Sequence, residues 1–538
     1  MIEVLTNANI YTLEPDNATA RALAIDNGRI LAIGNPDRLT AEFSGKGKTI
    51  DLQGRTVLPG LIDAHIHLEQ FALFLEKLDC ETKSISDCLQ RVQDRATITP
   101  PGEWILGHGW YQNEWDDHPG FPSATDLDAV APHHPVFLTA KSLHLAWANS
   151  AALSAAGINE HSNDIPGGSI GRDHNGKPDG LLFEQAMTLV SQNIPRHSDE
   201  YVYQAINSAQ NVLWSMGITS VHDFDQRQCF QTLQSLHKNK QLNLRIIKGI
   251  PLEDLDYAIG LGLRSGFGDE LLRIGSIKLF SDGALGPRTA AMLSPYQGDV
   301  QNRGMLFMDA EELYEHGRKA VRNGLSLAIH AIGDRANHEV LKAFAKLRLI
   351  EGEIQAAQGL QSNLLRHRIE HVQIIHPQDA VQMAHLRIIA SMQPLHATSD
   401  FPAADQHWGE RSENAYAWRS LLNLGTPLAF GSDAPVESPN PFWGLHAAVT
   451  RRRQDGSPGP DGWHPEQRLR LIEGLHAYTT GAAYAAGIDD RLGKLSPGYL
   501  ADLVVLETDP FLDDPNNLFN MKPVGTMVNG KWVFCTFN

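Results

Sequence analysis

LPGLIDAHIH, residues 58–67, is an apolar run that ends in two histidines separated by one residue. Side chains of an extended strand alternate between its two faces, so His65 and His67 point the same way and can reach one divalent cation. The Pro-Gly pair marks a turn, and the apolar residues after it continue a buried strand. A lone His-x-His pattern also occurs as two structural histidines, so the assignment of a metal depends on further ligands elsewhere.

Four more side chains that could hold or bridge metal ions stand at the ends of short apolar runs: Lys278, His330, His371 and Asp433. Strand ends converge on one point only in a closed barrel or at a switch point of a sheet. Eight candidate strands are present, at 58–64, 219–224, 244–250, 274–280, 325–330, 367–372, 388–393 and 427–432. Helical patterns separate the later ones, at 309–323, 334–349 and 377–384. This alternation predicts an α/β fold built on a (β/α)8 TIM barrel.

The two ends of the chain carry a different pattern from its middle. Short alternating segments, broken by Asn-Gly and Gly turns, fill residues 1–57 and again residues 496–538. Neither end has enough strands for a stable sheet of its own. We therefore expect the two ends to form one small β-domain, with the barrel domain, 58–495, inserted between them.

The interval of about 70–215, between the first and second barrel strands, is too long for a structureless loop. We expect a large inserted subdomain here, rich in aromatic and histidine side chains. It begins just after His67, at the rim where metal would lie. The insertion is therefore expected to pack over that rim and to form walls for a substrate.

The composition is that of a large enzyme and argues against several classes of partner. With 538 residues, 42% of them hydrophobic, the chain can bury one large core and a smaller domain. A net charge of −18 argues against nucleic acid or an anionic membrane as the main partner. The expected partner is a small-molecule substrate. No stretch reaches the ~18 apolar residues of a spanning helix, and the cysteines are scattered, so we expect a cytoplasmic protein with reduced thiols. The oligomeric state is open, and a homodimer is allowed.

Eight motifs follow one another along nearly the whole chain: PGLIDAHIHLEQF (59–71), SLHLAWANSAAL (142–153), TSVHDFD (219–225), IKLFSDGALGPRTA (277–290), IHAIGDRANHEVL (329–341), RIEHVQ (368–373), GSDAPVESPNPFWGLHAAVTR (431–451) and GKLSPGYLADLVVLETDPF (493–511). Single pieces occur in many unrelated folds, but the ordered set is specific. It resembles the amidohydrolase superfamily, and within it the metal-dependent hydrolases that include the YtcJ-like proteins and N-substituted formamide deformylase. The resemblance implies a metal-dependent barrel and a β-sandwich formed from both termini.

For the site, the resemblance implies a binuclear metal centre with two zinc ions per chain. The ligands would be His65, His67 and Asp433 for the more buried ion, His330 and His371 for the second, and carboxylated Lys278 for both. In binuclear members the matching lysine carries a carbamate, whereas an unmodified ammonium would repel the ions. The alternative for Lys278 is a buried lysine paired with Asp282 or Glu370.

The same residues predict the reaction. Two such ions activate water to hydroxide near neutral pH. Asp433 is the candidate general base, and it would pass the proton to the leaving amine. The expected function is hydrolysis of an amide-type carbon–nitrogen bond, as in an N-substituted formamide or an N-acyl compound, without a covalent intermediate. Asp433 could also cap the following helix, which is compatible with catalysis.

Two alternatives stay open. A mononuclear deaminase would share the His-x-His pair, the fifth-strand histidine and the eighth-strand aspartate. It usually needs a glutamate that residues 331–334 do not offer, and it has no use for Lys278. A non-catalytic scaffold of amidohydrolase descent would have lost ligands, whereas all six are present here.

The candidate substrate-binding residues are Trp110, His144, Asn149, His222, Asp282 and Arg288. The first three match motifs of the group within the insertion, although each could instead belong to its core. The others lie at the end of the second strand and in the loop after Lys278, where Arg288 could clamp a carboxylate or form a salt bridge within the loop. Glu370 precedes His371 on one strand, so it should point to the opposite face and be structural.

Overall fold

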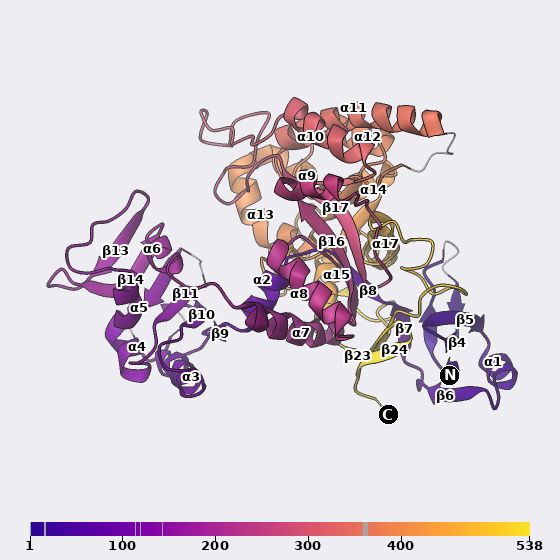
Figure 1. Cartoon of the computed structure of the whole chain (residues 1–538), viewed down its shortest axis with the longest axis horizontal. Coiled ribbons are helices and arrows are strands. Elements are labelled where there is room, and N and C mark those ends of the chain that lie inside the picture. Colours follow the sequence, from indigo (N-terminus) through magenta and orange to yellow (C-terminus); the bar gives the residue numbers. More distant parts are fainter. Residues whose placement is uncertain are drawn as a thin grey trace. The chain divides into compact units, whose positions relative to one another are not determined.

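The computed structural model describes residues 2–14, 18–112, 115–118, 120–141, 144–358 and 364–537 (Figure 1). The chain forms two compact units. The first consists of Met1–Phe71 with Ile206–Asn538, and the second of Ala72–Ala205. Among the described residues, no helix is both long and apolar enough to pass through a membrane.

One sheet of eight parallel strands builds the first unit, in the order β21-β20-β19-β18-β17-β16-β15-β8. Their bounds are β8 (Leu61–Ile66), β15 (Ile218–Asp223), β16 (Arg245–Pro251), β17 (Leu272–Phe280), β18 (Leu327–Ala331), β19 (Arg368–His371), β20 (Ile389–Met392) and β21 (Leu428–Phe430). The last strand returns to the first, because Asp433 N donates to His65 O at 2.7 Å and His67 N donates to Ala434 O at 2.9 Å. The predicted barrel is confirmed.

Helices follow most of these strands (Figure 1), and the sequence predicts three of them, at 309–323, 334–349 and 377–384. The helices are α8 (Arg227–Lys238), α9 (Leu255–Gly260), α10 (Ala310–Arg322), α11 (Asp334–Gln358), α12 (Pro377–His385), α13 (Pro394–Trp408), α14 (Trp418–Asn423) and α15 (Pro441–Thr450). At the start of α10, the Asp309 carboxylate accepts from Glu312 N while the Glu312 side chain accepts from Asp309 N. Leu313 and Val321 on the same helix are buried in the barrel core.

The first barrel strand begins later than its apolar run does. Residues 56–59 form β7 (Thr56–Pro59), which belongs to a different sheet, and the barrel strand starts only at Leu61. Gly60 lies between them, and a Cβ there would come within 2.4 Å of Thr219 Oγ1 on β15. The predicted strand 58–64 is therefore divided at a glycine that lets the chain pass from one sheet to the other.

The two chain ends form a β-sandwich with a shared core. One sheet has the order β5-β4-β1-β6 and the other β24-β23-β22-β7-β2-β3. Their remaining bounds are β1 (Ile2–Thr6), β2 (Asn9–Tyr11), β3 (Thr19–Ala20), β4 (Ala22–Asp26), β5 (Arg29–Gly34), β6 (Gly47–Asp51), β22 (Leu503–Leu506), β23 (Pro523–Val528) and β24 (Lys531–Cys535). β7 pairs with β22, which joins the two ends. Leu23, Val57 and Val505 are buried together, so the expected sandwich is confirmed.

The second unit is the insertion after the first barrel strand. Its sheet has the order β13-β14-β12-β11-β10-β9. The elements are β9 (Leu78–Asp79), α3 (Ile85–Ile98), β10 (Ile105–Trp110), α4 (Ala124–Val130), β11 (Val136–Ala140), β12 (Leu145–Ala148), α5 (Ser150–Ala155), β13 (Gly168–Arg172), β14 (Pro178–Glu184) and α6 (Met187–Ser191). It has its own apolar core, in which the rings of Trp110 and Trp147 lie 5.9 Å apart. Its packing over the barrel rim stays a prediction.

Candidate metal centre

The structure brings His65, His67 and Asp433 together at the C-terminal ends of the first and last barrel strands. Asp433 Oδ1 lies 3.5 Å from Nε2 of His65 and 3.5 Å from Nε2 of His67. The three ligand atoms all lie within 4.8 Å of one another. His65 Nε2 is buried and has no hydrogen-bond partner among the described residues, so it is available to bind an ion. These are the three residues that the sequence predicts for the more buried metal.

A buried network holds Asp433 against the first strand. Asp433 has a φ of 61°, a left-handed conformation that residues other than glycine adopt only when the surroundings impose it. The Asp63 carboxylate accepts from Ser432 N at 2.9 Å and from Ser432 Oγ at 2.5 Å. Burial raises the pKa of Asp63 to about 7. At Gly431 a Cβ would come within 2.4 Å of His65 N, so this glycine is needed for the close approach of the two strands.

Glu370 orients His65 and does not point away from the site. Its Oε2 accepts from His65 Nδ1 at 2.6 Å, and its carboxylate is paired with Arg368. Burial alone would raise the pKa of Glu370, but Arg368 and His65 hold that pKa well below its usual range. Burial lowers the pKa of His65 to about 4. A carboxylate on Nδ1 leaves Nε2 of this histidine for the ion.

The expectation that Glu370 and His371 point to opposite faces was wrong because the strand ends irregularly. His371 has a φ of 78° and Val372 a φ of 46°, so the alternation of an extended strand is lost at His371. The ring of His371 lies 5.0 Å from that of His65 and 4.6 Å from that of His330. Both Glu370 and His371 therefore serve the same site.

His67 is held by Asp225, a residue of the TSVHDFD motif that was not assigned a role from the sequence. Asp225 Oδ1 accepts from His67 Nδ1 at 3.1 Å, while Oδ2 accepts from Glu69 N at 2.5 Å and Gln70 N at 3.2 Å. The Asp225 carboxylate thus orients the His67 ring and accepts hydrogen bonds from the free N–H groups in the first turn of α2 (Leu68–Leu75). The sequence signal that could have indicated this role is the position of Asp225, two residues beyond the end of the second strand.

His371 and His330 approach the site by different ring atoms. His371 Nδ1 donates to Gln393 Oε1 at 2.8 Å, which leaves Nε2 for an ion. His330 Nε2 donates to the Gly283 carbonyl at 3.0 Å, which leaves Nδ1. Burial lowers the pKa of His330 to about 4 and that of His371 well below its usual range. Both rings are therefore neutral near pH 7, as a metal ligand must be.

Lys278 is buried among the histidines, and no described residue forms an ion pair with it. Its Nζ lies 4.7 Å from the centre of the Phe224 ring and 5.1 Å from that of Phe280. Among the described residues, no carboxylate lies within 4.0 Å of Nζ, so the alternative of a pair with Asp282 or Glu370 is not found. Burial lowers the pKa of Lys278 to about 8.

The other candidates in the barrel unit are placed as follows. His222 is buried and its Nδ1 accepts from Arg368 at 2.7 Å. Asp282 accepts from the backbone N–H groups of Ile332 and Gly333, at 3.0 and 2.8 Å, and thus anchors the loop after β18. Arg288 has an exposed side chain, 3.5 Å from Asp299, which is the salt bridge within the loop that the sequence left open.

The candidates in the insertion have structural contacts. Trp110 is fully buried and donates from Nε1 to Leu138 O at 2.9 Å. Asn149 is fully buried, accepts from Val136 N and Ala152 N, and donates to two backbone carbonyls. These contacts place both side chains in the interior of the insertion, and a role in substrate binding stays a prediction. His144 is exposed and lies 2.9 Å from Glu184.

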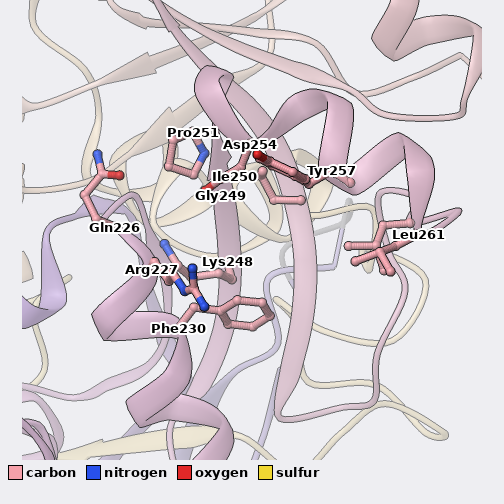
Figure 2. A pocket seen from close by; sticks show the side chains of 12 residues that line it. Gln226, Arg227, Phe230, Lys248, Gly249, Ile250, Pro251, Asp254, Tyr257 and Leu261 are labelled. Carbon is pink, nitrogen blue, oxygen red and sulfur yellow. The ribbon is translucent and has the colours of Figure 1, made fainter. Parts of the chain in front are cut away.

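A separate pocket of about 430 Å³ lies beside α8 and α9 (Figure 2). Its walls include Arg227, Phe230, Lys248 and Tyr257, and none of the six predicted ligands. The Lys248 ammonium lies 2.9 Å from Asp223 and donates to the Asp225 carbonyl. This lysine therefore supplies the positive charge in the cluster of Asp223, Asp225 and Cys229. Because none of the predicted ligands lines the pocket, the pocket is distinct from the metal centre.

Replacing Asp225 by asparagine is expected to weaken metal binding by about 10- to 100-fold, the usual cost of losing an outer partner of a ligand. The amide would donate to His67 Nδ1, which places the ring hydrogen on Nε2 and blocks ligation. Titration with a competing chelator measures the affinity. Asp269→Asn is the matched control, because Asp269 lies 2.7 Å from His237 in another, largely exposed pair. Equal affinities in the two variants would contradict the role of Asp225.

Known proteins resemble the chain along its whole length. The family model described as amidohydrolase family matches residues 48–534. The chain is 32% identical over 535 residues to the protein YtcJ of Bacillus subtilis, covering 98% of each. It is 28% identical over 550 residues to N-substituted formamide deformylase of Arthrobacter pascens, covering 98% of this chain and 97% of the other.

A solved structure agrees with these relatives. The crystal structure of a metal-dependent hydrolase from Pyrococcus furiosus matches with a TM-score of 0.76 and 29% identity, covering 95% of this chain and 100% of its own. The structure has a barrel, a terminal sandwich and a cluster of histidines with an aspartate. The family match covers most of the same sequence. The chain belongs to the amidohydrolase family, in the YtcJ-like and formamide deformylase-like group that its eight motifs predicted.

Proposed function

We propose that this protein is a metal-dependent hydrolase that cleaves an amide-type carbon–nitrogen bond, such as that of an N-substituted formamide or an N-acyl compound. The observation that carries the proposal is Asp433, whose Oδ1 lies 3.5 Å from two histidine nitrogens while its side chain stays 13% exposed. An acid in this position can contact both an ion and an incoming substrate. The full-length similarity to a formamide deformylase supports the choice of bond.

The donor set fits divalent metal. Neutral histidine nitrogens and a carboxylate are the donors that zinc takes in catalytic sites, where one position stays open. We assign His65, His67 and Asp433 to one ion and His330 and His371 to the other. When bound, such ions would lower the pKa of water toward neutrality and polarise the scissile carbonyl.

Lys278 is proposed to bridge the two ions as a carbamate. The ammonium would first lose one proton; the nitrogen of the free amine would then bond to the carbon of carbon dioxide and lose a second proton. With two protons released, a negative charge replaces a positive one. Support comes from its burial beside the histidines and from the lack of a carboxylate partner among the described residues. Two cations held about 3.5–4 Å apart need an anion between them, and no other side chain of β17 supplies one.

Asp433 is proposed as the general base. It would accept a proton from the attacking water and deliver it to the nitrogen of the leaving amine. Its backbone is held to β8 by the 2.7 Å hydrogen bond to His65 O, so the carboxylate stays in register with the ligands of the first strand. Glu370 and Asp225 keep the two first-strand histidines in the tautomer that binds metal.

Metal analysis tests the centre directly. Protein purified with zinc or manganese is expected to hold two ions per chain, and chelation is expected to abolish turnover. Readdition of either ion should restore it. One ion per chain, together with deamination of a substrate, would support the mononuclear deaminase instead.

A substrate panel tests the bond. N-substituted formamides, N-acyl amino acids, cyclic amides and carbamates should be assayed with zinc- and manganese-loaded protein by the appearance of free amine. We expect turnover of at least one class, and none by the Asp433→Asn variant assayed in parallel. A fully metal-loaded protein that leaves every class intact would contradict the proposed function.

A further inference from the structure

We propose that His396 is a ligand of the second metal ion, sharing it with His371 and Asp433; this rests on the proposed function. His396 lies in the first turn of α13, just after the seventh barrel strand, β20. Neither the strand-end pattern nor the two metal assignments above include it. Its imidazole reaches the centre from a strand that otherwise supplies no ligand.

The geometry matches that of the first ion. The ligand atoms of His371, His396 and Asp433 all lie within 4.8 Å of one another, as do those of His65, His67 and Asp433. His396 Nε2 lies 3.9 Å from Asp433 Oδ2, whereas Oδ1 of the same carboxylate faces the first-strand histidines. Asp433 therefore offers one oxygen to each group of histidines.

The unpartnered Nε2 atom of His396 supports a role as a metal ligand. His396 is 6% exposed, and its Nε2 is buried without a hydrogen-bond partner among the described residues. A buried polar atom without a partner is costly in a folded protein. His65 Nε2, on the other side of Asp433, is orphaned in the same way. Two unpartnered nitrogens beside one carboxylate are explained together if each binds a cation.

Two glutamines contact the Nδ1 atoms of His371 and His396 and can hold both rings with Nε2 free for metal. His371 Nδ1 donates to Gln393 Oε1 at 2.8 Å, and His396 Nδ1 lies 3.4 Å from the amide of Gln373. Each glutamine follows the strand next to that of its histidine. For Nε2 of His396 to bind metal, Gln373 must present its oxygen to Nδ1, and that oxygen is now buried without a partner. A half turn of the amide, which exchanges two nearly equivalent atoms, provides it.

His330 alone does not complete the ligand set of the second ion with His371. Its Nε2 is taken by the Gly283 carbonyl, and among the described residues it belongs to no cluster of three close ligand atoms. The rings of His371 and His396 lie 6.0 Å apart, and each of these two histidines contributes an atom to such a cluster with Asp433. His396 thus gives the second ion a further protein ligand, from the helix that follows the seventh strand.

Metal stoichiometry and cobalt spectra of two variants test this. We expect His396→Ala to hold one ion per chain where the wild type holds two. We expect His396→Cys to recover the second ion and, with cobalt, to show a new sulfur-to-metal charge-transfer band. The band requires a direct bond and would not arise from a structural role. His446→Ala removes a buried histidine whose ring meets the Phe519 ring edge-on, and this control should keep two ions.

The outcomes test the role of His396 separately from the proposal that the centre holds two ions. Two ions in His396→Ala with an unchanged cobalt spectrum, or a folded His396→Cys variant without the band, would overturn the assignment of His396. If the wild type itself holds one ion, the two-ion scheme fails. In that case, at least 10-fold weaker binding by His396→Ala together with the band in His396→Cys would still support His396 as a ligand. If His396→Ala does not fold by circular dichroism, the cysteine variant alone decides.

Discussion

Lys278→Ala is expected to lose the second metal ion and to lower turnover by about 10²–10³-fold, the range seen when one preorganised electrostatic contact is removed from an active site. Apart from the Asp433 carboxylate, the carbamate is the only anion that we place between the ions. Without it, two cations would repel each other at close range, and β17 cannot offer a replacement without moving its backbone. Metal analysis and kcat of the purified variant measure both effects.

Small carboxylates should restore part of the activity of Lys278→Ala, because acetate can occupy the space left by the carbamate. The control is Lys319→Ala, which removes a lysine from an exposed pair with Asp256 and should keep wild-type metal content. Two ions retained in Lys278→Ala would reject the carbamate bridge. Such a result, combined with a lower melting temperature, would mean that Lys278 contributes only to packing.

Asp433→Asn is expected to lower kcat by about 10²–10⁴-fold, because this is the usual contribution of general acid–base catalysis. The amide keeps the size of the side chain and one oxygen for the ion, but it cannot accept the proton of the attacking water. The melting temperature should change little, since the hydrogen bonds that hold residue 433 come from its backbone.

Metal content measured beside the rate distinguishes a base from a ligand. If Asp433 accepts the proton, most of the rate should be lost while two ions per chain are retained. Asp256→Asn, a change on the surface, should leave both rate and metal content intact. A rate for Asp433→Asn within 10-fold of the wild type, at full metal content, would exclude Asp433 as the base.

The sequence was sufficient to predict the barrel and the meeting of His65, His67 and Asp433 at one rim, because both depend on local patterns. Apolar runs of strand length, each ending in a ligand-type residue, mark where strands stop. Once the strands are parallel and closed into a barrel, their C-terminal ends must lie at one rim. His65, His67 and Asp433 therefore lie together in the structure without any contact having been known beforehand.

Tertiary structure alone decided the details that depend on backbone irregularity and on neighbouring strands. The left-handed conformation at His371 brings Glu370 and His371 to one site, which strand alternation cannot predict. The buried contacts of Trp110 and Asn149 show that these motif residues build the insertion. His396 begins a helix, so no periodic pattern marks it. Its role becomes visible only where its unpartnered nitrogen meets Asp433, because that distance is fixed by packing between distant segments and not by local sequence.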